Sequence, residues 1–454
     1  FFLIPGWISN DQGRAYVLDR LNARLHGPRV TIDKWSLSWF SGTDIQNLRV
    51  LEPDGTPMLT CPHVLSGLTL WDLLWGNYDL RNTTADKLEM RIQKNTDGTT
   101  SLDSFAQGAG DVIRSARGAV QVNNGRLNLV SAKGGQSIQY EDIKAAIVIA
   151  SPEAPFRVQI SGATAAGAPL SLSATFPPTT SLADTRLRNP KSWSLLDDVS
   201  FSAEQLPAAM LCDFLAVDPA WVDSFGEKLA SVTFSSRNSP TKGVILSELH
   251  ITGTPRNGSA TMLNATLELF PPHEDGRGAA IAAGESKCTA ALRFSPPLAR
   301  LLGRLNPILG EASADPTGLV RLSAQFDLPL DRPSDATAAL RLTFPPLTFT
   351  PRDGPSLVRQ LQFAAGEIPR PAGPPHFAGT ADVLRGTLAG GEFSYDNFLV
   401  SLARTRINFS GAAGLDGQVN LIAAIATSTS GLGSATTRVA ITGNFEAPVA
   451  TGAR

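Results

Sequence analysis

The residues of this chain that could take part in catalysis are few and widely separated. His250, in the stretch LSELHITG, carries the side chain of a general base, but no nucleophile or carboxylate is patterned around it. The pair Asp197-Asp198 lies beside a predicted strand start, where a solvated turn is the simpler interpretation. These positions do not predict an active site, so we expect a protein that is not an enzyme.

Metal and redox chemistry have equally little support. The chain has five histidines, with no HExxH motif and no other close pair. Its three cysteines, Cys61, Cys212 and Cys288, are far apart and lack CxxC spacing, which argues against a disulfide framework and a structural zinc site. Such thiols behave as small core hydrophobes. We therefore expect neither a metal nor another cofactor.

The charge balance excludes one class of partner. Lys plus Arg total 39 and Asp plus Glu total 41, without long runs of either sign, so the basic footprint of a nucleic-acid-binding protein is missing. The chain opens with FFLIPGW and has no initiator Met. Phe1 to Ile4 before Pro5-Gly6 is what the trailing end of a membrane anchor would look like, and an ordinary buried terminus is the alternative.

The elements that must position any site are mainly β-strands. Apolar and polar residues alternate from Phe156 to Ile160, from Leu170 to Phe176, from Cys288 to Phe294 and from Val320 to Leu330. Dipeptides suited to tight hairpins separate such segments: Asp54-Gly55, Asp97-Gly98, Asn124-Gly125, Asn257-Gly258 and Asp416-Gly417. This pattern predicts an antiparallel meander of about twenty strands.

Three segments have helical spacing instead. Residues 9–25 form a predicted amphipathic helix that Asn10 or Ser9 can cap, and residues 203–229 a predicted helical pair. The third, SPPLARLLGRLNPILGEA, begins at Ser295-Pro296 and is interrupted at Pro307. For the first helix we favour a plug over one end of the sheet, because its charges have mixed sign; binding in the membrane interface is the alternative.

One predicted strand, VTIDKWSLSWFSG, does not keep its alternation. Val30 and Ile32 share one phase, whereas Trp35, Leu37 and Trp39 share the other. Because a one-residue slip moves every later side chain to the opposite face, either the strand carries a bulge or both of its faces are covered by apolar groups.

Two terminal segments together resemble the AsmA-like proteins of bacterial envelopes, relatives of TamB and of bridge-like lipid-transfer proteins built from repeating β-groove units. The N-terminal segment runs from LIPGW through HGPRVTIDKWSLSWFSGTDIQNLRVLEPDGTPMLTC to LSGLTLWDLLWGNYDLRN and LEMRIQKNTDGTTSL. The C-terminal segment is FSYDNFLVSLARTRINFSGAAGLDGQVNLIAAIA with TRVAITGNFEAPV. The matches cover a quarter to a third of the chain, and the middle matches only in strand character.

The resemblance implies a mainly β protein in which a long curled antiparallel sheet, a β-groove, follows an N-terminal amphipathic helix. It implies a periplasmic location, anchoring to the inner membrane by an N-terminal helix, and a role in guiding phospholipid for outer-membrane biogenesis. The expected regions are an anchor end with a capping helix (1–29), an N-terminal AsmA-like β-groove (30–200), a β region with helical inserts (201–311) and a C-terminal AsmA-like β-groove (312–454).

A groove would act by burial and not by bond chemistry. At about 0.8 kcal/mol per methylene, a sixteen-carbon chain in water costs on the order of 12 kcal/mol, which a continuous apolar track would lower. The candidate lining residues are apolar members of the predicted strands: Trp35, Leu37, Trp39, Leu88, Met90, Ile92, Phe156, Val158, Ile160, Leu170, Leu172, Phe176, Leu292, Phe294, Leu322 and Phe326.

Other interpretations of the same pattern stay open. Alternation also suits a closed β-sandwich, in which two apolar faces cover each other. A structural or adhesive envelope protein that binds partners by its edges and carries no lipid is the main functional alternative. A carbohydrate-active β-helix enzyme is the third, although no carboxylate cluster stands out.

Overall fold

The computed structural model describes residues 4–25, 27–75, 79–95, 99–102, 117–132, 136–176, 178, 197–214, 217, 221–239, 244–255, 259–270, 280–281, 286–329, 335–353, 355–365, 376–403, 405–427 and 435–452. The protein is mainly β, with a large mixed sheet and few short helices, which confirms the predicted fold class. Two compact units divide the chain: unit 1 (Phe1–Pro219 and Ser231–Lys242) and unit 2 (Ala220–Ala230 and Gly243–Arg454).

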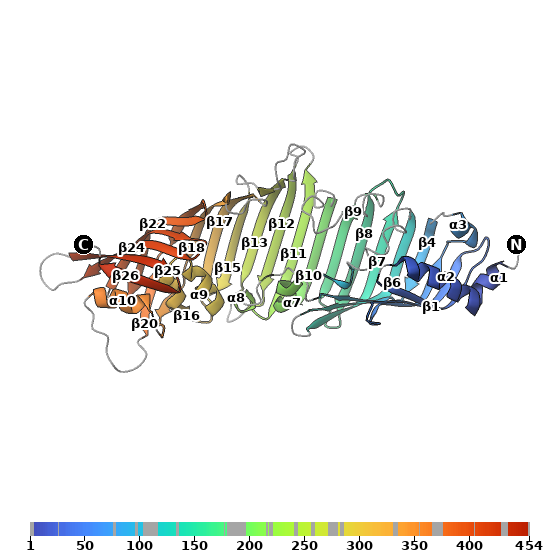
Figure 1. Cartoon of the computed structure of the whole chain (residues 1–454), viewed down its shortest axis with the longest axis horizontal. Coiled ribbons are helices and arrows are strands. Elements are labelled where there is room, and N and C mark those ends of the chain that lie inside the picture. The colour runs from blue at the N-terminus through green and yellow to red at the C-terminus, as the bar shows by residue number, and fades with distance from the viewer. Residues whose placement is uncertain are drawn as a thin grey trace. The chain divides into compact units, whose positions relative to one another are not determined.

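Unit 1 begins with helices and continues as a sheet (Figure 1). Its helices are α1 (Ile4–Ser9), α2 (Asp11–Arg24), α3 (Leu70–Leu74) and α7 (Ala208–Phe214). Its strands are β1 (Arg29–Ser36), β2 (Thr43–Leu51), β3 (Pro57–Ser66), β4 (Asp79–Asp86), β5 (Glu89–Gln93), β6 (Arg117–Val130), β7 (Ser137–Ile149), β8 (Phe156–Thr164), β9 (Pro169–Phe176) and β10 (Asp197–Pro207). Strand β11 (Lys228–Ser239) contributes residues to both units.

The strands of unit 1 are mostly, but not entirely, antiparallel. Strands β1, β2 and β3 are antiparallel neighbours, and so are β6 to β10 in chain order. Strands β4 and β5 both pair with β3 on one side and run parallel to β6 on the other. The connection between β5 and β6 is long enough to return the chain, and a parallel pair requires such a crossover. The expected antiparallel meander is therefore a mixed sheet at this point.

The interrupted alternation of β1 recurs in the strands beside it. In each strand, two residues outside the apolar pattern separate two that belong to it. Pairing aligns the first five of these tetrads, so that Ala85 faces Val64 on one side and Val122 on the other, and the sixth meets the fifth at the Gly125–Ile143 pair. We call this aligned row the crease. Its tetrads are Ile32-Asp33-Lys34-Trp35, Ile45-Gln46-Asn47-Leu48, Cys61-Pro62-His63-Val64, Ala85-Asp86-Lys87-Leu88, Val122-Asn123-Asn124-Gly125 and Tyr140-Glu141-Asp142-Ile143.

The backbone accommodates the crease with residues that tolerate a left-handed conformation. Asn47, Asn124 and Asp142 have φ of 53°, 52° and 51°, and Asn and Asp are the non-glycine residues most often found there. On β8 the crease ends at Gly162, where an added Cβ would lie 2.4 Å from Cδ1 of Ile143. Register shifts, the mark of β-bulges, occur at the crease where β7 pairs with β6 and with β8.

Two of the predicted hairpin turns are confirmed and one is wrong. Asp54-Gly55 and Asp416-Gly417 lie in turns, with positive φ at both glycines. Asn124-Gly125 lies inside β6, at the crease, because the left-handed conformation that suits a tight turn also suits a bulge. Asp97-Gly98 and Asn257-Gly258 lie outside the described residues.

The irregularity in β1 is resolved in favour of a single apolar face. Val30 and Ile32 belong to a cluster against which Trp35 also packs, together with Leu21 of α2. Trp35 therefore faces the same side as Val30 and Ile32. The matching slip in β2 preserves the pairing across the crease, and Leu37 and Trp39 lie beyond the end of β1.

Helix α2 covers the free edge of β1. Asn10 caps its start by accepting a 2.9 Å hydrogen bond from the amide of Gly13. Near its end, the Asn22 side chain donates to the carbonyl of Val30 at 2.9 Å and accepts from the amide of Val30 at 2.7 Å. The side-chain amide of Asn22 thus forms the two hydrogen bonds that a neighbouring strand would form with Val30. At this residue the backbone groups on the outer edge of β1 are therefore not available to another strand. The contact agrees with the predicted plug.

Unit 2 consists of strands and short helices. Its helices are α8 (Trp221–Phe225), α9 (Pro296–Gly303), the 3-10 helix η1 (Pro307–Glu311) and α10 (Leu357–Ala364). Its strands are β12 (Val244–Gly253), β13 (Met262–Phe270), β14 (Ala280–Ile281), β15 (Lys287–Arg293), β16 (Ala312–Ala314), β17 (Leu319–Pro329), β18 (Thr337–Thr343), β19 (Leu347–Phe349), β20 (Phe377–Ala381), β21 (Leu384–Ala389), β22 (Glu392–Leu402), β23 (Thr405–Gly414), β24 (Gln418–Thr427), β25 (Ala435–Asn444) and β26 (Ala447–Gly452).

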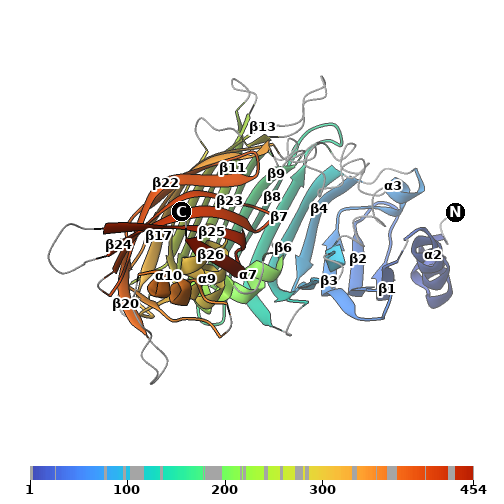
Figure 2. The same ribbon diagram turned by 60° about the vertical axis from the view of Figure 1, so that its left-hand side comes forward.

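The sheet of unit 2 packs on its helices. Strands β15, β17, β18, β21 and β22 are successive antiparallel neighbours, and β22 to β26 follow in chain order. One large apolar cluster joins these strands to Leu302 of α9, Ile308 of η1 and Leu361 of α10. Figure 2 shows α9 and α10 against the strands of this unit. The helices thus cover much of the apolar side of this sheet.

The helical inserts follow the prediction in part. Ser295 caps α9, Pro296 is its first residue, and Pro307 starts a separate 3-10 turn, as expected. The predicted helical pair over residues 203–229 is shorter than expected. It consists of α7 and α8, because residues 203–207 continue strand β10 and β11 begins at Lys228. Asp218-Pro219, the predicted start of the second helix, lies outside the described residues.

Helix α10 binds the backbone of the edge strand β26 in the same way that α2 binds β1, through a side-chain amide. The Gln360 side chain donates to the carbonyl of Pro448 at 3.0 Å and accepts from the amide of Ala450 at 2.6 Å. Strand β25 is the only pairing partner of β26 in the described part of the chain. In each unit, therefore, the side-chain amide of one helix residue hydrogen-bonds to backbone groups of one edge strand.

Candidate functional site

The apolar face of unit 1 is the first candidate site. Strand pairing brings period-two apolar residues of β6 to β10 into two rows. The rows are Val120–Ile147–Val158–Ala174 and Val122–Ala145–Ile160–Leu172–Phe201. At about 4.8 Å between strands, the longer row spans roughly 19 Å. We refer to these residues, with Phe156, Leu170 and Phe176, as the apolar face of unit 1.

This face is partly open. Val158, Ile160, Leu172 and Phe176 are half-buried and not fully covered. Ile160 packs against one apolar cluster, and Val158 and Phe176 pack against another. Among the described residues both clusters consist of strand residues, such as Tyr140 and Phe156, so this cover comes from neighbouring strands of the same sheet. Tyr140 and Ile143 lie at the two ends of one crease tetrad and belong to the same cluster, so both side chains face this side of the sheet.

The opposite face of the same strands is polar. Gln121, Ala146, Gln159, Ser173 and Ser200 are aligned by the same pairing. Most of these residues line a shallow concavity of about 480 Å³ together with Lys144. Four members of the longer apolar row also border it: Val122, Ala145, Ile160 and Leu172. The sheet therefore presents one apolar and one polar side, as the alternation predicts.

The N-terminal lining candidates lie beside helices or along the crease. Trp35 packs beneath α2 and donates its indole N–H to the carbonyl of Ile8 at 2.7 Å. Leu37 and Trp39 are buried, and the Trp39 ring meets that of Trp71 edge-on at 6.3 Å. Half-buried candidates follow on the next strands: Leu88, which packs beside the crease, and Met90 and Ile92 of β5, which pair with β6.

The other predicted lining residues of unit 1 lie together on one face of the sheet, whereas those of unit 2 lie in two different places. Phe156, Val158, Ile160, Leu170, Leu172 and Phe176 lie on the apolar face, where the rings of Phe156 and Phe176 stack at 5.2 Å. In unit 2, Leu292, Phe294 and Leu322 belong to the cluster that includes α9. Phe326, further along β17, is half-buried opposite Ala338.

A second candidate site is an apolar pocket of about 300 Å³ in unit 2, between α9 and the sheet. Leu301 and Leu415 line it and remain 42% and 57% exposed, so its mouth is apolar. Arg304 also lines it, and its guanidinium lies 5.6 Å from the ring centroid of Phe445. The other lining residues are Trp221, Leu292, Leu298, Leu302, Leu305, Val320, Leu322, Leu340, Leu342, Ala413 and Gly414.

Sequence reasoning missed most of this pocket. Only Leu292 and Leu322 are among the predicted lining residues. The leucines of α9 were visible as an apolar helix stripe, but the sequence did not show that the helix stops short of filling the space above β17 and β18. The crease was also missed beyond β1, although its recurring tetrads are a readable signal.

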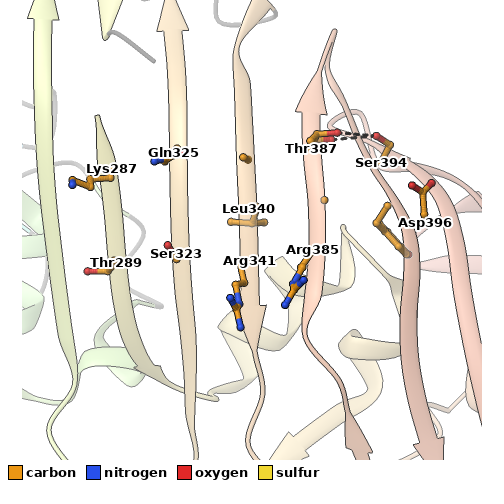
Figure 3. Close-up of a pocket in the computed structure, with 13 residues that line it drawn as sticks. Lys287, Thr289, Ser323, Gln325, Leu340, Arg341, Arg385, Thr387, Ser394 and Asp396 are labelled. Atoms are coloured by element: carbon orange, nitrogen blue, oxygen red, sulfur yellow. Dashed lines mark hydrogen bonds between the residues drawn. The ribbon is translucent and has the colours of Figure 1, made fainter. Parts of the chain in front are cut away.

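A third feature is a concavity of about 510 Å³ on the polar side of unit 2. Figure 3 shows it across β15, β17, β18 and β21, with Lys287, Ser323, Arg341 and Arg385 among its lining residues. Ser394 and Thr387 bridge their hydroxyls at 3.2 Å at its border. The site is open and hydrophilic, in contrast to the apolar pocket.

The titratable groups of the described residues do not form a catalytic cluster. Desolvation raises the pKa of the Cys61 and Cys288 thiols, which disfavours the thiolate needed for nucleophilic attack. His250 is hydrogen-bonded to Asn264 at 2.9 Å. Within the part of the chain that the structure describes, no three potential metal ligands of the His, Cys, Asp or Glu type gather.

Comparison with known proteins adds no relative. No family model matches the chain, and no match is found among curated proteins or solved structures. Helices long and apolar enough to cross a membrane are missing from the described residues. Of the predicted anchor end, Phe1 to Ile4, the first three residues lie outside the described part of the chain.

Proposed function

We propose that this protein binds the acyl chains of phospholipids and guides them within the bacterial envelope, without catalysing a reaction. The observation that carries the proposal is the partly open apolar face of unit 1. An acyl chain laid on such a surface removes apolar area from water on both partners, at about 25 cal/mol per Å². No directional contact is needed, so the surface suits chains of differing length.

The apolar pocket of unit 2 supports the same chemistry. Its volume of about 300 Å³ lies at the lower end of the range for small-molecule sites, which are mainly apolar with a few polar groups. Arg304 at this pocket supplies a cation for an anionic head group, while Leu301 and Leu415 offer apolar contacts at the mouth. The two units thus contain separate surfaces of the same chemical kind.

The envelope setting rests on the terminal segments that resemble AsmA-like proteins. It includes a periplasmic location, a tether to the inner membrane through an N-terminal helix, and a role in outer-membrane biogenesis. The protein in its native cells should sediment with inner membranes and be accessible to protease only after the outer membrane is opened. Sedimentation with the cytosolic fraction would contradict this part of the proposal.

The alternative, an adhesive protein that binds partners by its edges, has less support. Asn22 and Gln360 already occupy hydrogen-bonding groups of β1 and β26, which are the groups that an added strand would use. An edge-binding protein would be expected to leave these groups free.

A pair of adjacent positions on β8 tests the lipid proposal. Val158 lies on the apolar face and Gln159 on the polar one. A photo-crosslinking amino acid in place of Val158 should capture phospholipid in cells and the same residue in place of Gln159 should not. Native mass spectrometry of gently purified protein should show bound phospholipid, and Val158→Glu should reduce it while Gln159→Glu does not.

Two outcomes would reject the proposal. One is lipid-free protein after gentle purification together with no crosslink at position 158. The other is equal crosslinking at positions 158 and 159, which would mean that lipid contacts the sheet without regard to its faces. Circular dichroism of both glutamate variants shows whether either result reflects loss of the fold.

A further inference from the structure

The polar concavity of unit 2 places two arginines directly opposite each other. Arg341 of β18 and Arg385 of β21 are register partners in the antiparallel pair. Side chains at such positions have Cβ atoms about 5 Å apart, and like charges there destabilise the pairing. Figure 3 shows the two side chains extending side by side in the same direction. Both residues are exposed.

The surroundings do not neutralise this pair. The ion pairs found among the described residues include neither Arg341 nor Arg385. Asp396 lines the same concavity, but Figure 3 shows its carboxylate directed away from the two guanidinium groups. With Lys287, the charged lining residues are three cations and one carboxylate, a net charge of +2, whereas the whole chain has a net charge of -2.

Neutral hydrogen-bond donors continue the row on which the arginines lie. Ser323 is the register partner of Arg341, and Thr289 is the register partner of Ser323. The row Thr289–Ser323–Arg341–Arg385 therefore crosses four strands on one face of the sheet. Guanidinium groups present N–H donors in a fork that fits phosphate oxygens, and hydroxyls can donate to the same oxyanion.

We propose that Arg341 and Arg385 form a binding site for the phosphate group of an anionic ligand. A dianionic phosphate between the two guanidinium groups would offset their mutual repulsion. The site lies on the polar side of the sheet, so it does not depend on lipid binding by the apolar surfaces. The phosphate can belong to a lipid head group or to a soluble phosphate compound, because both present the same oxygens.

Titration of the full chain with inorganic phosphate tests the site. Isothermal titration calorimetry should show saturable binding that sodium chloride at equal ionic strength does not reproduce. Arg341→Gln and Arg385→Gln should each weaken it by about tenfold or more, as expected for loss of charge-assisted hydrogen bonds. The matched control is Arg157→Gln. Arg157 is an exposed arginine on the polar side of unit 1 whose register partners are Val148 and Thr175.

Vesicles distinguish the two sources of phosphate. Vesicles of phosphatidylcholine with phosphatidylglycerol should bind the wild type, and release it on addition of phosphate, if the source is a lipid head group. Phosphate binding without vesicle binding supports a soluble ligand. The proposal is overturned if phosphate acts no differently from chloride, or if Arg157→Gln weakens binding as much as Arg341→Gln. Bound lipid on the apolar face is scored separately with Val158→Glu.

A second measurement does not require the ligand. Because the two arginines repel each other, Arg341→Gln should raise the midpoint of urea unfolding at low ionic strength, and added salt should remove the difference. A lower midpoint at low salt would show that the pair already has a counter-charge in solution and would overturn the argument.

Discussion

Two buried tyrosines should respond in opposite directions to the same substitution. Tyr140 in unit 1 is 0% exposed, and its hydroxyl is buried with no hydrogen-bond partner among the residues that the structure describes. Tyr395 in unit 2 is 3% exposed, but its hydroxyl accepts a hydrogen bond from Asn306 Nδ2 at 3.0 Å and donates to the carbonyl of Leu305 at 3.4 Å. Replacement by Phe removes one oxygen in both cases.

The magnitudes follow from the two environments. A buried polar group without a partner costs about 1–3 kcal/mol, so Tyr140→Phe should raise the free energy of unfolding by about 1 kcal/mol after loss of some packing. Tyr395→Phe removes the hydroxyl that accepts from the Asn306 amide, and Asn306 is itself 0% exposed. This substitution should lower the free energy of unfolding by about 2 kcal/mol. Burial also raises the pKa of both phenols, consistent with neutral hydroxyls in each place.

Urea unfolding of the full chain measures both effects. Because the chain contains two compact units, each variant should be compared with the wild type at the transition that it shifts, with the slope against urea unchanged. The reasoning is refuted if Tyr140→Phe lowers stability by about 1 kcal/mol or more, since the hydroxyl must then have a partner in solution. Tyr395→Phe provides the internal control for the loss of an oxygen at a bonded site.

Three further substitutions test other contacts. Lys94, 7% exposed, donates to the backbone carbonyl of Phe214 at the end of α7 at 2.9 Å, so Lys94→Met should cost about 2 kcal/mol in urea unfolding. Asn22→Ala should reopen the edge of β1 and raise the aggregation rate in light scattering, whereas an unchanged rate would argue against edge protection. Burial raises the pKa of Glu311 above its ordinary 4.5, so the folded protein holds that proton more tightly than the unfolded chain. The stabilising contribution of this carboxyl is full at pH values below the ordinary pKa, and it is lost as the pH rises through the raised pKa of the folded protein. In a pH series of urea unfolding, Glu311→Gln should abolish this dependence.

Part of the candidate site could be predicted from single strands. Val158, Ile160 and Leu172 were placed on one face by period-two alternation alone, and pairing puts them there. This works because successive side chains of a strand point to opposite sides, whatever the rest of the chain does. The start of α9 at Ser295-Pro296 was predictable for a similar reason, since capping depends on neighbouring residues only.

Other parts depend on contacts between distant segments. Asn124-Gly125 suits a hairpin turn and a bulge equally well, and only the pairing of Val122 with Ala85 and of Gly125 with Ile143 in neighbouring strands identifies the crease. The apolar pocket likewise requires α9, β18 and Leu415 to meet, although their sequences are unrelated in spacing. Contacts between such distant segments leave no periodic pattern in the local sequence.

The sequence by itself determined that the strands of this protein have one apolar and one polar face, because alternation acts within each strand. Only the tertiary structure decided what covers the apolar face. In unit 2, α9, η1 and α10 supply a packed core, whereas the clusters on the apolar face of unit 1 consist, within the described part of the chain, of strand residues. The physical reason is that burial depends on which distant elements pack together, and alternation carries no information about that choice.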